Sequence, residues 1–93
     1  MIKSFADRET EKIFNLVFSH RLPTSIQALA RRKMIMLNVA SELQDLRFPP
    51  GNHLEMLHGD RARQYSICIN DQWRICFYWI DGNSHHVEIV DYH

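Results

Sequence analysis

The run "QWRICFYWI", residues 72–80, constrains the fold most, because large apolar and aromatic side chains follow one another almost without interruption. Side chains along a strand alternate between two faces. The odd-numbered residues from Trp73 to Trp79 therefore share one face, and Arg74, Cys76 and Tyr78 share the other. The aromatic face is expected to be the core face. A chain with such a strand must build a sheet and cover one side of it.

The remaining elements follow from hydrophobic periodicity and from the positions of proline and glycine. Further strands are expected at residues 1–5, 53–57, 65–70 and 85–93, with helices at residues 8–19 and 26–46. Asp7 is the expected N-cap of the first helix, and Thr24 or Ser25 of the second. The order β-α-α-β-β-β-β predicts an α+β fold: one domain, residues 1–93, with a helical hairpin packed on a mainly antiparallel sheet.

Charge and composition exclude several classes of protein. Eleven basic and eleven acidic residues cancel, which removes the argument for a globally basic nucleic-acid-binding protein. The chain contains no apolar run long enough for a membrane span and no signal peptide, so we expect a cytoplasmic protein without membrane contacts. Cys68 and Cys76 lack metal-site spacing and are expected to be buried, reduced thiols. Neighbouring strand residues His85 and His86 point to opposite faces, so neither a metal nor another cofactor is expected.

The register of the last two strands brings the end of the chain to Arg74. If "DGNS" forms a tight connection, the hydrophobic pattern pairs the strands as follows: Trp79 with Val87, Phe77 with Ile89, Cys76 with Val90, and Arg74 with Tyr92. A slip of one residue would turn every side chain to the other face. In the favoured register, Arg74 meets the terminal Asp91-Tyr92-His93 at one end of the sheet.

These four residues have the chemistry needed to cleave RNA without a metal. That reaction needs a base for the 2′-hydroxyl, a cation for the charge on phosphorus, and an acid for the leaving oxygen. Arg74 suits the cation role because its planar fork matches phosphate oxygens. Tyr92 and His93 suit proton transfer, and Asp91 could orient His93. The same residues also fit a plain terminal strand, with Asp91 and His93 in water and Tyr92 packed on Arg74.

Three stretches of the sequence together resemble a known family. They are "MIKSF", "LHGDRARQYSICINDQWRICFYWI" and "VEIVDYH", and their most specific combination is Gly-Asp-Arg, then Trp-Arg-Ile-x-Phe, then a terminal Asp-Tyr-His. Over nearly the whole chain they resemble the HigB-type toxins of bacterial type II toxin–antitoxin modules, a plasmid-maintenance branch of the RelE/ParE superfamily. The resemblance implies a RelE-like fold.

The resemblance also implies a function, a set of partners and a set of site residues. Members are metal-independent endoribonucleases that cut messenger RNA on the 70S ribosome, which inhibits translation and growth. A HigA-type helix-turn-helix antitoxin neutralises them, and operator DNA is bound only through that complex. The family's roles carry over to Arg74, Asp91, Tyr92 and His93. His58 stands where the family often has lysine.

One catalytic position departs from the family. Glu55 occupies a position where well-studied members have histidine. A carboxylate can still act as a base there, but the loss of an imidazole implies slower or altered cleavage.

Five basic residues are the expected contacts to ribosomal RNA phosphates: Arg31, Arg32, Lys33, Arg61 and Arg63. Consecutive helix residues lie about 100° apart, so the run 31–33 spreads over about 200° and cannot form one row. It also fits a solvated helix face.

Two other functions remain open from the sequence. One is a gyrase-poisoning toxin of the same superfamily, against which the terminal triplet argues. The other is a non-catalytic module that contacts only an antitoxin or a DNA complex.

Overall fold

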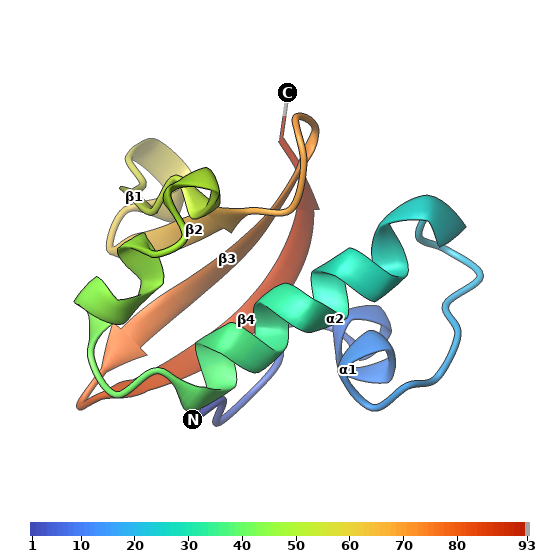
Figure 1. Ribbon diagram of the computed structural model, residues 1–93, viewed down its shortest axis with the longest axis horizontal. Helices are drawn as coiled ribbons and strands as arrows, with labels where there is room; N and C mark the ends of the chain where they lie inside the picture. Colours follow the sequence, from blue (N-terminus) through green and yellow to red (C-terminus); the bar gives the residue numbers. More distant parts are fainter. Residues whose placement is uncertain (93) are drawn as a thin grey trace.

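The computed structural model describes residues 1–92, which form two helices on one face of a four-stranded antiparallel sheet (Figure 1). The strands lie in the order β1-β2-β3-β4, with bounds Glu55–Met56, Gln64–Cys68, Trp73–Ile80 and Asn83–Asp91. The helices are α1 (Arg8–Phe14) and α2 (Thr24–Val39), and α2 runs obliquely across β3 and β4. Short 3₁₀ segments η1 (Leu43–Arg47) and η2 (Pro50–Asn52) connect α2 to β1, and η3 (Gly59–Arg61) connects β1 to β2. The predicted α+β fold is confirmed.

Helix α1 begins as predicted and ends early. The Asp7 carboxylate accepts a hydrogen bond from the Thr10 backbone N–H at 2.7 Å, which caps the helix. The predicted end at residue 19 is wrong, since α1 ends at Phe14. Leu16 has a φ of +63°, in the left-handed region, so the chain leaves the helical path there.

Helix α2 is also shorter than predicted. It begins directly after Pro23 with no side-chain cap, so the expected caps Thr24 and Ser25 already lie inside the helix. It ends at Val39, and the rest of the predicted helix to residue 46 is a bend followed by η1. Asp45 explains the break, because its carboxylate accepts from the backbone N–H groups of Ser41 and Glu42 at 3.0 Å and competes with helical pairing.

The predicted first strand pairs only in part. Ile2 bridges to Ser84 and Phe5 to Val87, both in parallel orientation. The segment therefore runs beside β4 and extends the sheet on that side, although these bridges are isolated and do not form a continuous ladder. It lies at the edge opposite β1.

The predicted register of β3 and β4 is wrong by two residues at Arg74 and by three next to the turn, where Trp79 pairs with Ser84 and not with Val87. Arg74 pairs with Val90, not Tyr92, and Ile75 pairs with Ile89. The connection is a two-residue turn in which Asp81 and Gly82 have φ values of +52° and +78°, as in a type I′ hairpin, and it is tighter than the four-residue link expected. A bulge in β4, between the pairs Cys76–Glu88 and Tyr78–His85, contains His86 at a φ of +56°.

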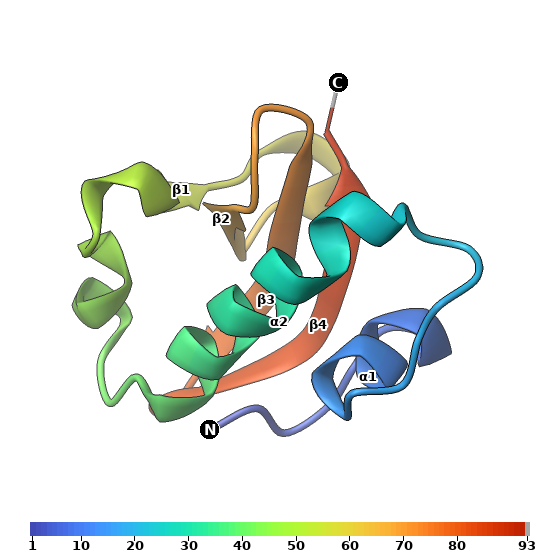
Figure 2. The same ribbon diagram turned by 45° about the vertical axis from the view of Figure 1, so that its right-hand side comes forward.

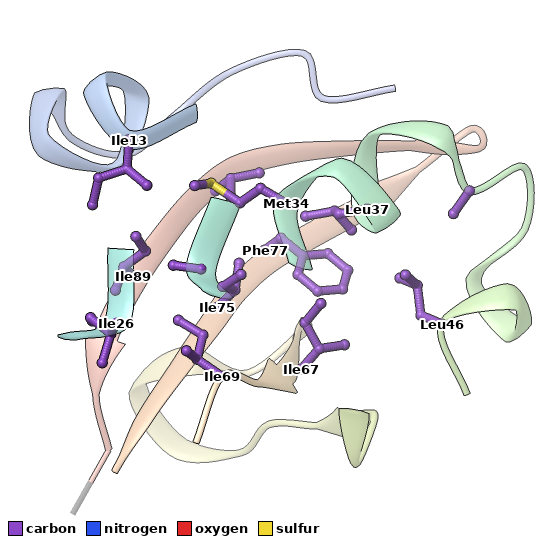
Figure 3. Packing of buried hydrophobic residues seen from close by; sticks show 13 residues of the cluster. Ile13, Ile26, Met34, Leu37, Leu46, Ile67, Ile69, Ile75, Phe77 and Ile89 are labelled. Atoms are coloured by element: carbon purple, nitrogen blue, oxygen red, sulfur yellow. The ribbon is translucent and has the colours of Figure 1, made fainter. Parts of the chain in front are cut away.

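In the half of the ladder that holds Arg74 the shift is even, so the two faces of the sheet there are as predicted. Ile75 and Phe77 are fully buried, and Met34 and Leu37 of α2 lie over Phe77 (Figure 3). Each such side chain contributes about 1.5–3 kcal/mol through burial. The core thus uses one face of the sheet, and Arg74 stands on the other. Within residues 1–92, no helix has the length and apolarity needed to cross a membrane.

Candidate active site

Arg74 lies on the sheet face that the helices leave uncovered, and its side chain is fixed from two directions. Its Nε donates to the Ser66 hydroxyl at 2.8 Å, and its Nη2 donates to the His53 carbonyl at 2.7 Å. Arg74 is 9% exposed and Ser66 is fully buried. The guanidinium is therefore held between β3, which carries it, and Ser66 of β2, and it is still partly accessible at the surface.

Tyr92 and Glu55 surround the same guanidinium. The Arg74 Cζ lies 5.4 Å from the centre of the Tyr92 ring, in cation–π geometry. Glu55 Oε1 is 4.0 Å from Arg74 Nη2, and its side chain is 52% exposed. Arg74 and Tyr92 are therefore neighbours through a diagonal contact and not through direct pairing. A cation, a phenol and a carboxylate converge on one point of this face.

The end of β4 is held by the turn between β2 and β3, which lies beside it in Figure 2. The Tyr92 backbone N–H donates to the Gln72 carbonyl at 2.7 Å, and the Gln72 amide donates to Asp91 Oδ2 at 3.1 Å. Asp91 pairs with Trp73 in the register, so it follows the opposite alternation from Tyr92. His93, which Asp91 was expected to orient, lies outside the described residues.

A pocket of about 270 Å³ opens beside Tyr92. It is lined by Leu57, His58, Asp60, Arg61 and Tyr92. Tyr92 thus contacts Arg74 and also forms a wall of this pocket, which brings the exposed His58 of the predicted site to the same region. Segment η3 supplies Asp60 and Arg61 of this lining.

Arg61 crosses the polar face of the sheet instead of extending into solvent. Its Nη1 donates to Glu88 on β4 at 3.0 Å and to Gln64 on β2 at 3.2 Å. The Glu88 carboxylate raises the pKa of Arg61 further above its usual value. Arg63, by contrast, is exposed, with a φ of +76°.

The three basic residues 31–33 of α2 have different surroundings. Arg31 Nε donates to the Phe14 carbonyl at 3.0 Å and so holds the end of α1. Lys33 Nζ donates to the Asn52 amide oxygen at 2.6 Å, while Arg32 is exposed. The run therefore forms no basic row, as its spacing predicted.

Sequence reasoning missed two residues beside the site, Ser66 and Glu88. Both stand at the strand positions that alternate onto the Arg74 face, and Ser66, Cys76 and Glu88 form one row across β2, β3 and β4. Parity alone could have placed them there, but nothing in the sequence indicates which side chain each one bonds.

The two free cysteines differ in burial. Cys76 is buried as predicted, and burial raises the pKa of its thiol, which keeps it protonated. Cys68 is free but only half-buried, so that part of the prediction is wrong. Among residues 1–92, no group of three or more histidine, cysteine, aspartate or glutamate side chains is arranged to hold a metal ion.

The sequence matches one protein family and several of its relatives. The family described as "RelE-like toxin of type II toxin-antitoxin system HigB" matches residues 3–93. "Toxin HigB-1" of Vibrio cholerae is 40% identical over 83 residues, covering 88% of this chain and 87% of the relative. "Endoribonuclease HigB" of Proteus vulgaris is 28% identical over 96 aligned positions that span all of both chains. The chain therefore belongs to the HigB-like family of RelE-like toxins from type II toxin–antitoxin systems.

Proposed function

We propose that the protein is a toxin that acts as an endoribonuclease, cutting messenger RNA on the ribosome and so stopping translation and growth. The observation that carries this proposal is the Arg74 guanidinium, fixed on the polar sheet face with Tyr92 at 5.4 Å and Glu55 at 4.0 Å. A relative bears the name endoribonuclease, which supports the same chemistry.

The proposed reaction is an internal transfer at phosphorus. A base removes the 2′-hydroxyl proton, the 2′-oxygen attacks phosphorus, and the 5′-oxygen leaves after receiving a proton, so the products are a 2′,3′-cyclic phosphate and a 5′-hydroxyl. Arg74 stabilises the charge that develops on the phosphate oxygens, without a metal ion. Glu55 serves as the base and Tyr92 as the proton donor. His58, Asp91 and His93 complete the proton-transfer network.

The ribosome supplies the RNA surroundings that this neutral protein cannot attract by itself. Arg32 and Arg63 are exposed and are the first proposed contacts to ribosomal RNA phosphates. Arg31, Lys33 and Arg61 also make hydrogen bonds within the protein, and their remaining donors would join the contact.

An antitoxin is implied by the family. We propose that it is a HigA-type helix-turn-helix protein and that it alone recognises operator DNA. The balance of acidic and basic residues in the toxin is consistent with this division, because the toxin has no excess charge that would attract DNA.

Primer extension on a messenger RNA, with and without 70S ribosomes, tests the proposed function. We expect cleavage only with ribosomes, and a loss of about a hundredfold or more in Arg74→Ala. Arg47→Ala, which removes an exposed arginine on η1, is the matched control and should cleave normally. Growth arrest without RNA cleavage in either condition would rule the function out.

A further inference from the structure

The planar guanidinium of Arg74 is held along one edge, the edge that carries Nε and Nη2. The two observed hydrogen bonds use Nε and Nη2, and within residues 1–92 no group bonds to Nη1. An arginine side chain carries several N–H donors in one rigid plane, so fixing two of them fixes the direction of all the others. The Nη1 end of the fork is therefore oriented before any substrate arrives.

Ser66 is the inner support of this arrangement. It is fully buried on β2, and its hydroxyl lies 2.8 Å from Arg74 Nε. Register pairing puts Ser66 directly between Glu55 on β1 and Cys76 on β3. The serine hydroxyl therefore reaches Arg74 from a strand that takes part in the sheet on both sides and has little freedom to move.

The His53 backbone is the outer support. His53 has a φ of +45°, a left-handed conformation that a residue with a Cβ adopts only against steric resistance. It follows η2 directly, and its carbonyl accepts from Arg74 Nη2 at 2.7 Å. Strained backbone of this kind persists where the surrounding structure enforces it, and here it aims a carbonyl at the arginine.

Without these supports, Glu55 would compete for the cation. Its Oε1 is 4.0 Å from Nη2, at the limit of an ion pair and too far for a hydrogen bond, and its side chain is half-exposed and able to move. A guanidinium released from Ser66 could turn towards this carboxylate and form a close, bidentate pair. Such a pair would occupy the fork that the phosphate needs and the carboxylate that the base role needs.

We propose that Ser66 is a positioning residue, which together with the His53 carbonyl keeps Arg74 from closing into a hydrogen-bonded pair with Glu55 and ready to receive a phosphate group. This rests on the proposed function and names the groups that prepare its central residue. The ligand chemistry is that of a phosphodiester oxygen received by the Nη1 end of a fixed guanidinium.

Cleavage kinetics on ribosomes give the first test, with three serine variants. Ser66→Ala should lower the rate about ten- to a hundredfold, because it removes one hydrogen bond to a charged group. Ser66→Thr keeps a hydroxyl and should retain most activity. Ser84→Ala removes an equally buried hydroxyl from β4, where it lies 3.5 Å from the Met1 carbonyl, and should cleave normally.

A double variant separates positioning from general loss of structure. In an Arg74→Lys background the amine cannot use the Ser66 hydroxyl as the guanidinium does, so adding Ser66→Ala should change the rate by less than about twofold. A wild-type rate in Ser66→Ala, or an equal loss in the Arg74→Lys background, would overturn the proposal.

NMR of the Arg74 Nε–H resonance tests the same proposal without any cleavage assay. In the wild type this proton should exchange slowly with water, and its resonance should shift when inorganic phosphate is added. Ser66→Ala should speed the exchange and weaken the phosphate-induced shift several-fold, while Ser84→Ala should do neither. Unchanged exchange and phosphate response in Ser66→Ala would refute positioning, whereas absent RNA cleavage by the wild type would refute only the proposed function.

Discussion

At the scale of single residues, the site combines a fixed arginine with exposed, replaceable partners. Arg74 is 9% exposed and donates hydrogen bonds to Ser66 on β2 and to the His53 carbonyl. The half-exposed Glu55 carboxylate lies 4.0 Å from Arg74 Nη2. Changes at Glu55 should therefore alter chemistry and leave folding nearly intact, since surface substitutions usually change stability by less than about 0.5 kcal/mol.

Replacing Glu55 by histidine should increase cleavage. An imidazole titrates near neutral pH and is the better matched base, so Glu55→His should raise the rate about tenfold, while Glu55→Gln should lose most activity. Single-turnover cleavage on ribosomes measures both, and urea unfolding checks that the two variants are equally stable. A slower Glu55→His variant would contradict the assignment of a base to this position.

Cys76 should make stability depend on pH in alkaline solution. Burial raises the pKa of its thiol above the ordinary value of 9.0. As pH rises past about 9, the unfolded chain loses this proton while the folded chain keeps it, so the free energy of unfolding falls. Urea denaturation from about pH 8 to pH 10 should show a smaller decline in Cys76→Ala than in the wild type. Cys68→Ala, at the half-buried cysteine, should behave as the wild type does.

At the scale of elements, the sequence predicted which face of the sheet is buried better than it predicted where helices end and which strand residues pair. Alternation along β3 correctly separated Phe77 from Arg74, because burial requires one apolar face. The register failed because pairing was counted through a four-residue connection, although Asp81-Gly82 is itself a strong signal for a two-residue turn. The His53 carbonyl could not be predicted, since its direction depends on a left-handed backbone with no periodic pattern.

The basic run of α2 gives a prediction at this scale, because its members differ in their contacts. Arg32→Glu should weaken ribosome co-sedimentation without changing stability, since Arg32 is exposed. Arg31→Glu should also lower stability by about 1 kcal/mol, because its hydrogen bond to the Phe14 carbonyl is lost. Sedimentation with 70S ribosomes and urea unfolding of both variants measure the difference. Unchanged sedimentation of Arg32→Glu would exclude this contact.

At the scale of the whole molecule, the chain end matters to the site more than to the fold. Tyr92 is 44% exposed, and its backbone N–H donates to the Gln72 carbonyl in the neighbouring turn. The core, from α1 to β4, is complete before this residue. Tyr92 therefore contributes its ring to the Arg74 face but little buried area.

Deleting Tyr92 and His93 should leave a folded protein that no longer stops growth. The deletion removes the aromatic ring over Arg74, one wall of the pocket, and two proposed proton-transfer groups. Growth after induction without an antitoxin measures toxicity, and circular dichroism with urea unfolding measures folding. Continued growth arrest by the truncated protein would remove both residues from the proposed mechanism.

The two faces of the single sheet have different roles, one in folding and one in the proposed activity. Substitutions of Ile75, Phe77 and their neighbours mainly affect whether the chain folds. Substitutions of Arg74, Ser66 and Glu88 mainly affect activity. A library randomised only at the partly exposed positions of the polar face on β3 and β4, Tyr78, Glu88 and Val90, should thus yield mostly well-expressed proteins of widely varied potency. Mutations on the polar face can therefore change the toxicity of the protein while its hydrophobic core stays the same.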